Sequence, residues 1–179
     1  MEAVRGPDSI QCAAAASPEI ILTRLVETYQ TPLMHICYMI LHDEALAEDA
    51  VQETFLKAYK ALGQFRGESS EKTWLFRIGM NVCRDMRRGR WFRYVDLRVT
   101  PDTLPIPAGE AEEDYEELAQ AIVLLPDKYK EPLLLYYYQD MTIEETAQLL
   151  GVGKSTVHNR LRKAEGLLKL VLKGGDCYV

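Results

Sequence analysis

Histidine, paired cysteines and long apolar runs are all scarce in this chain of 179 residues. It has three histidines and four scattered cysteines, Cys12, Cys37, Cys83 and Cys177, without a C-x-x-C pair. This spacing disfavours a metal site or a disulfide framework, so we expect no metal and reduced thiols in the cytoplasm. Cys37 and Cys83 fall among apolar helical positions and are predicted to be buried. No apolar run approaches the roughly 20 residues that span a bilayer, so no membrane insertion is expected.

Strand patterns and catalytic constellations are missing too. No segment alternates apolar and polar residues as a strand does, and no nucleophile, histidine and carboxylate occur in a catalytic order. Residues 151–156 end like a phosphate-binding P-loop, but that motif needs a glycine at position 148, which is Gln148. We therefore expect an all-α protein that is not an enzyme and has no cofactor.

The chain has fewer basic than acidic residues overall, but the basic residues are concentrated in two segments. The net charge is −6, yet residues 66–98 hold nine Arg or Lys against four acids, and residues 154–173 hold six against one. Between these segments, residues 102–117 hold seven acids and no base. Two cationic segments separated by an anionic one suit a protein that touches DNA at two places.

The front of the chain reads as a series of helices. Ser17–Pro18 and Thr31–Pro32 each pair a capping hydroxyl with a proline, which predicts two helix starts. A third helix is predicted from about Asp43 to Leu62, and a fourth over Thr73–Arg88. Trp74 is predicted to lie in the core.

Near the C-terminus the pattern predicts a helix-turn-helix. Thr142 and Glu145 have capping-box spacing, and Gly151 is placed to end the first short helix. In the second helix, buried positions are predicted at steps of four, three and four, and basic and amide side chains remain outside. The buried positions are Val157, Leu161, Ala164 and Leu168. Such a helix commonly lies in a DNA major groove.

A proline-containing acidic stretch divides the chain. We predict an N-terminal tail over residues 1–16, a helical domain over 17–95, a flexible acidic linker over 96–115 and a second helical domain over 116–174. The expected fold class is therefore all-α, with two small helical domains.

Two surfaces of the front domain suggest binding. Acids and an amide gather on one face of the third predicted helix, which is either a solvated face or a docking surface for a basic helical partner. Aromatic residues alternate with arginines over residues 65–94, as expected where unstacked bases and phosphates are held. Arg84, Arg87 and Arg88 are predicted to contact phosphate.

Several motifs in order resemble bacterial RNA polymerase sigma factors of the extracytoplasmic-function (ECF) class. In the front domain they are Asp49-Ala-Val-Gln52-Glu53-Thr-Phe55, Phe65-Arg66-Gly67-Glu68-Ser69-Ser70 and Thr73-Trp74-Leu75-Phe76-Arg77-Ile78, followed by Asn81. In the rear domain they are Leu125-Pro126-x-Lys128-Tyr129 and the helix-turn-helix with Thr156-Val157-x-x-Arg160-Leu161-x-Lys163-Ala164. The resemblance covers about residues 17–173.

The resemblance implies three sets of contacts. Core polymerase, through its β′ clamp helices, would bind Asp49, Gln52, Glu53 and Phe55. The melted minus-ten element would contact Phe65, Arg66, Ser69, Ser70, Lys72, Asn81, Arg84, Arg87 and Arg88. The duplex minus-35 element would contact Lys154, Ser155, Thr156, His158, Asn159, Arg160, Arg162 and Lys163.

The family also implies partners and a place of action. A cytoplasmic sigma factor binds the polymerase β flap in addition to the clamp helices, and many members are held inactive by a membrane-anchored anti-sigma factor. His158-Asn159 stands where the family commonly has Lys-Ser, so the promoter sequence is not predicted.

Three alternatives to this function make different predictions. A free-standing helix-turn-helix regulator would bind duplex DNA without polymerase. A helical adaptor would use the acidic helix for a protein partner and leave its basic segments solvated. The P-loop reading predicts nucleotide binding that Lys154→Ala abolishes.

Overall fold

The computed structural model describes residues 17–88 and 113–172, and these form seven α-helices without a strand. The front bundle comprises α1 (Pro18–Leu41), α2 (Glu44–Ala61) and α3 (Glu71–Arg88). The rear bundle comprises α4 (Glu113–Leu124), α5 (Asp127–Leu133), α6 (Ile143–Leu150) and α7 (Lys154–Leu172). The all-α prediction is confirmed. The predicted N-terminal tail, most of the predicted linker, Cys12 and Cys177 lie outside the described residues.

The predicted helix start at Thr31–Pro32 is wrong, because α1 continues through Pro32. A proline inside a helix removes one backbone hydrogen bond and crowds the preceding turn. Apolar residues on both sides of Pro32 compensate, since Leu25 and Leu33 are both buried against the rest of the bundle. At the other predicted start, Ser17 holds the cap position but makes no side-chain cap hydrogen bond.

The front core is centred on α3. Phe76 is fully buried and meets the Tyr29 ring edge-on, with centroids 6.3 Å apart. A Cβ at Gly79 would lie only 3.1 Å from Leu33 Cδ2, so glycine lets α3 approach α1 closely. Cys37 and Cys83 are free and buried here, as predicted.

In the rear bundle a proline again lies inside a helix. Pro132 is at the sixth position of α5, past its first turn, and the helix widens into a π-helical turn at Leu134–Tyr138. A missing N–H at proline is compatible with such a local change of hydrogen-bond register. Leu134 and Leu135 of this turn are buried, so the distortion keeps the apolar face of the segment inside.

The helix-turn-helix is confirmed. Thr142 Oγ1 accepts a hydrogen bond from the Glu145 amide at 3.2 Å, and Glu145 Oε2 accepts one from the Thr142 amide at 3.0 Å. Gly151 ends α6 in the left-handed conformation with φ +68°, which glycine adopts without strain. On α7 the buried residues are the four predicted, Val157, Leu161, Ala164 and Leu168.

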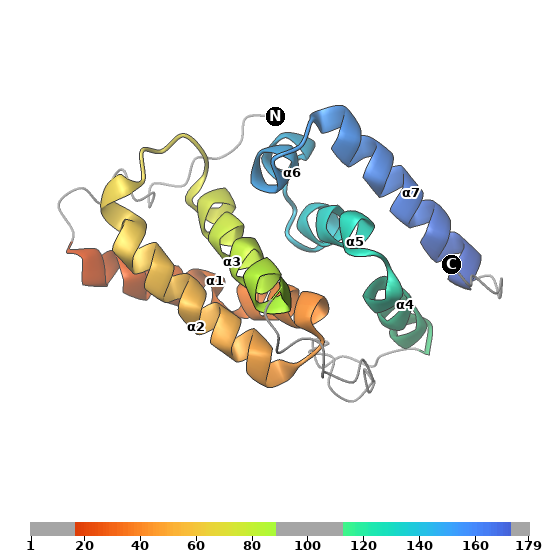
Figure 1. The fold of residues 1–179 in the computed structure, drawn as a ribbon, viewed down its shortest axis with the longest axis horizontal. Helices are drawn as coiled ribbons and strands as arrows, with labels where there is room; N and C mark the ends of the chain where they lie inside the picture. The colour runs from red at the N-terminus through yellow and green to blue at the C-terminus, as the bar shows by residue number, and fades with distance from the viewer. Residues whose placement is uncertain (1–16, 89–112, 173–179) are drawn as a thin grey trace.

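The two bundles lie side by side. Figure 1 shows α3 next to α6 and α5, while α7 runs along the edge of the rear bundle that faces away from the front bundle. Residues far apart in sequence are therefore brought together along α3.

Candidate nucleic-acid interface

Residues 63–69 and the start of α3 border a cavity of about 540 Å³. Phe65 and Trp74 supply its aromatic side, with ring centroids 5.1 Å apart and planes tilted by 54°. Its other lining residues are polar or small: Gly63, Gln64, Arg66, Glu68, Ser69, Arg77 and Gln148. Aromatic faces beside hydrogen-bonding groups are the chemistry that holds an unstacked nucleobase.

The sequence prediction placed Trp74 in the core and gave Arg77 no site role. Trp74 is only partly buried and lines the cavity with Arg77. Arg77 Nη2 donates to the backbone oxygen of Gln148 at 3.2 Å, whereas its buried Nε has no hydrogen-bond partner. Their spacing of three residues on α3, which puts both on one helix face, could have indicated a shared site.

Charged contacts fix the first turn of α3 and hence the cavity. Arg24 Nη1 and Nη2 donate to the two carboxylate oxygens of Glu71 at 2.6 and 2.8 Å. Burial and the Glu71 charge raise the pKa of Tyr29 to about 12, so its hydroxyl stays protonated and faces Glu71 at 3.4 Å. Ser70 Oγ accepts from the Thr73 amide at 3.1 Å, which caps the helix.

Three predicted DNA-binding cations on α3 already have partners in the rear bundle. Arg84 Nη2 pairs with Glu131 Oε2 at 2.6 Å, and Arg87 pairs with Asp127. Lys72 Nζ donates to the backbone oxygen of Gln139 at 2.5 Å. The sequence predicted these cations but not their partners.

The remaining predicted residues of α3 face solvent. Asn81 is exposed, and its Oδ1 accepts from Arg84 Nη1 at 3.4 Å. The Arg88 side chain is 80% exposed and lies 4.0 Å from Asp85. Pairs this exposed contribute little stability, so Arg88 is available to an anionic partner.

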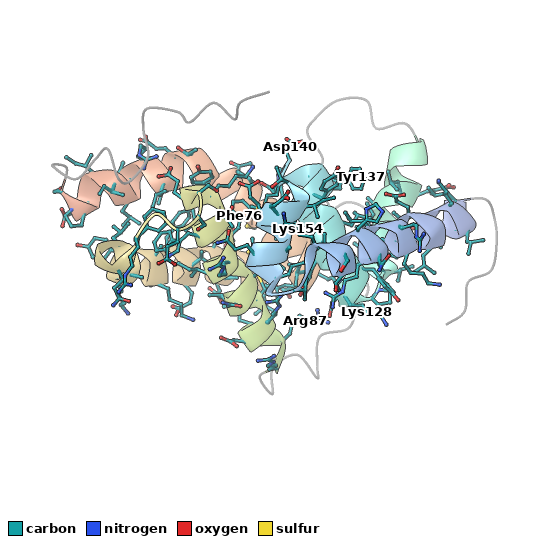
Figure 2. All side chains as sticks on the ribbon, turned by 90° about the horizontal axis from the view of Figure 1, so that it is seen from above. Phe76, Arg87, Lys128, Tyr137, Asp140 and Lys154 are labelled. Carbon is teal, nitrogen blue, oxygen red and sulfur yellow. The ribbon has the colours of Figure 1, made fainter. Side chains whose placement is uncertain are left out.

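The face of α7 that is predicted to contact the minus-35 element is largely exposed to solvent. Lys154, Ser155, His158, Asn159, Arg162 and Lys163 are exposed, and Thr156 and Arg160 are half-buried. Lys154 pairs with Glu144 of α6, and this hydrogen bond lowers the pKa of the Glu144 carboxyl. Figure 2 shows Lys154 close to the middle of the molecule, where α7 begins.

The residues predicted to dock on core polymerase lie on two sides of α2. Asp49 and Gln52 are exposed, and Glu53 lies 3.4 Å from Lys57 in an ion pair. Phe55 is buried, with 8% of its surface exposed, so it supports α2 from within. Leu56, which the prediction left out, is 55% exposed.

Comparison with known proteins matches each of the two bundles to one region of a single protein family. Residues 25–93 match the Sigma-70 region 2 family and residues 115–168 match Sigma-70, region 4. The RNA polymerase sigma-H factor of Pseudomonas aeruginosa is 30% identical over 163 residues, covering 83% of this chain and 84% of the relative. This chain belongs to the ECF class of RNA polymerase sigma factors. The front bundle is its region 2, and the rear bundle is its region 4.

Other similar proteins differ in length or are more distant. A probable RNA polymerase sigma factor, RfaY of Xanthomonas campestris, is 32% identical over 87% of this chain, which spans only 41% of RfaY. The sigma factor RpoE of Bartonella quintana, solved in complex with the anti-sigma factor NepR, has the same fold. Its TM-score is 0.69 at 24% identity, with 84% of this chain and 96% of that chain covered.

Within the described parts of the sigma factor, no helix is both long and apolar enough to cross a bilayer. Across the same two ranges, no group of three or more histidine, cysteine or acidic side chains could hold a metal ion.

Proposed function

We propose that this sigma factor binds a promoter at two places. Helix α7 lies in the major groove of the duplex minus-35 element, and the front bundle binds the melted minus-ten strand. The observation that carries the proposal is that one chain has two different surfaces whose chemistry suits nucleic acid. One is the exposed polar face of α7 in a capped helix-turn-helix, and the other is the aromatic cavity at Phe65 and Trp74.

The cavity supplies a driving force for melting. Unstacking a base costs a few kcal/mol, and stacking one base on an aromatic side chain returns about 1–3 kcal/mol. These contacts exist only after the strands part, so they shift the equilibrium towards open DNA. Lys72, Asn81 and Arg88 contribute to holding the same strand, through its phosphates and base edges.

The same proposal assigns partners. The acidic face of α2 docks on the β′ clamp helices of core polymerase, and the rear bundle binds the β flap. The linker over residues 96–115 joins the two DNA contacts through the RNA-exit path of the polymerase, where its acidic side chains resemble a transcript.

The protein acts in the cytoplasm as a non-catalytic initiation subunit without a cofactor. A membrane-anchored anti-sigma factor holds it inactive until an inducing signal arrives. The fold likeness to RpoE, which was solved in complex with the anti-sigma factor NepR, is consistent with an anti-sigma partner for this chain.

The reading of duplex DNA by α7 is tested by Asn159→Ala and Arg162→Ala. Both side chains are exposed on the outer face of α7, so their removal should leave the fold intact. If each makes a bidentate contact with a base, holoenzyme should lose about 1–3 kcal/mol of discrimination at one base pair of the minus-35 element. The measurement is competition binding against a library of single-base promoter variants. The control is Lys169→Ala at the far end of α7. Equal weakening of binding to every promoter variant would show that Asn159 and Arg162 contact the DNA backbone and not the bases.

A further inference from the structure

A buried lysine of the rear bundle meets a histidine of the front bundle where the two bundles join. Lys130 of α5 is only 2% exposed, and its Nζ lies 3.0 Å from Nε2 of His42, the residue that follows α1. Lys130 Nζ also donates to the backbone oxygen of Val123, within the rear bundle. His42 therefore links this buried amine to the front bundle.

Two helix ends fix the backbone around His42. His42 caps α1 in the left-handed conformation with φ 58°, and its N–H donates to the backbone oxygen of Tyr38 at 2.8 Å. The next residue, Asp43, caps α2, where its side chain accepts from the Leu46 amide at 2.8 Å. Because both neighbouring helices hold this backbone, the imidazole has little freedom to move away from Lys130.

The contact determines where the protons lie. A lysine ammonium has three donors and no acceptor, so His42 Nε2 accepts from it and the proton of the neutral imidazole is on Nδ1. This Nδ1 is buried and has no hydrogen-bond partner among the described residues. A second proton could bind only at Nε2, where it would point at the ammonium 3.0 Å away. Protonation of His42 therefore replaces a hydrogen bond with two like charges in contact.

Charged groups of α3, α5 and the start of α2 surround this pair. The acids of α5 that act on it already have arginine partners on α3, since Asp127 pairs with Arg87 and Glu131 pairs with Arg84. Asp43 already accepts the capping hydrogen bond of α2. Arg87, which Figure 2 shows where the bundles meet, adds a further positive charge near the pair. These acids are already engaged, so a second positive charge on the pair would gain little from them.

Both members of the pair bind a proton less readily while the bundles are joined. Burial lowers the pKa of His42 to about 4, and the positive charges of Lys130 and Arg87 add to this effect. Burial also lowers the pKa of Lys130 to about 8, so its amine is mostly protonated at pH 7. Separation of the bundles exposes His42 and moves its pKa towards the ordinary 6.5. The separated form then takes up a proton that the joined form does not, so acid favours separation.

We propose that His42 and Lys130 form an acid-sensitive joint, through which the bundles of the free chain separate as the pH falls from about 7 to about 5. The joint acts whichever surface of the chain binds DNA, so it does not depend on the proposed function. If His42 regains its ordinary pKa on separation, the equilibrium constant for separation rises by up to about twentyfold over this range. The sign is the same for Lys130, whose proton the joined form loses first as the pH rises above 8.

The test measures the distance between the bundles in the full chain, without polymerase or DNA, at pH 7 and pH 5. The readout is energy transfer between dyes on unnatural amino acids that replace Glu44 and Lys128, which are both exposed and lie close in sequence to His42 and Lys130. We expect energy transfer to fall at pH 5 while the helix content by circular dichroism stays constant. His42→Gln keeps an acceptor but cannot be protonated, so its energy transfer should stay high at both pH values.

The other two histidines of the chain supply matched controls. His35→Gln changes a half-buried histidine of α1, and His158→Gln changes an exposed one of α7. Both variants should lose energy transfer at pH 5 as the wild type does, because neither changes the joint.

Energy transfer that is equal at the two pH values in the wild type, or an acid response that persists in His42→Gln, would overturn the inference. A loss of helix content together with the loss of energy transfer would also overturn it, because acid would then unfold the chain. If His42→Gln does not fold at pH 7, His42→Asn replaces it, since asparagine tolerates the left-handed conformation. Titration of the wild-type imidazoles by nuclear magnetic resonance gives an independent result. A pKa of His42 well below 6.5 is expected, and an ordinary pKa would contradict the joint.

Discussion

Asp49→Arg should abolish assembly with core RNA polymerase at micromolar concentrations while the chain remains folded. Asp49 is exposed on α2, so the substitution should change the free energy of unfolding by no more than about 0.5 kcal/mol. Its effect on docking is much larger, because an acid facing a basic partner becomes a like charge, and such juxtapositions cost several kcal/mol.

The measurement is size-exclusion chromatography of the variant with core polymerase, together with thermal melting of the variant alone. Glu27→Arg makes the same charge change at an exposed site on α1 and should assemble as the wild type does. Normal assembly of Asp49→Arg would remove α2 from the docking surface.

Arg87→Ala combined with Arg88→Ala should weaken promoter binding by holoenzyme evenly across sequences and flatten its dependence on salt. Each arginine that no longer neutralises a phosphate should reduce the log–log slope by about 0.7 to 0.9, depending on whether the DNA is single-stranded or duplex. Removing both arginines therefore predicts a change of roughly 1.5 units, which the titration of promoter complexes against salt can resolve.

The salt experiment must be done with holoenzyme. In the free chain Arg87 pairs with Asp127, so its removal would also break a contact between the bundles, and that effect would be mixed with the loss of attraction to phosphate. Lys60→Ala on the exposed side of α2 is the control. If the slope does not change, these arginines do not contact phosphate.

The helix-turn-helix could be predicted because its signals are local. A capping box, one glycine in the left-handed conformation and a four-three-four spacing of apolar residues fix α6 and the inner face of α7 without reference to distant residues. Pro32 shows where local signals fail. The same hydroxyl–proline pair that starts α1 at Pro18 is overridden at Pro32, because burial of Leu33 and its neighbours outweighs the one missing hydrogen bond.

The contact between the bundles could not be predicted. Arg84 and Glu131 are 47 residues apart, and an arginine-rich helix looks the same in sequence whether its partner is phosphate or carboxylate. Gln148 is a similar case. In sequence it excluded the P-loop reading, and in the structure it lines the cavity beside Phe65. The family could be recognised from motifs in the right order, whereas the contacts of the α3 cations with the rear bundle could be seen only in the fold.

The most direct test of the two-site promoter model is transcription from sheared genomic DNA of the source organism by core polymerase, with and without this chain, followed by mapping of RNA 5′ ends. The model predicts discrete start sites that appear only with the chain, share two sequence elements near minus-ten and minus-35, and disappear with Asp49→Arg. RNA whose 5′ ends are the same with and without the chain would contradict it.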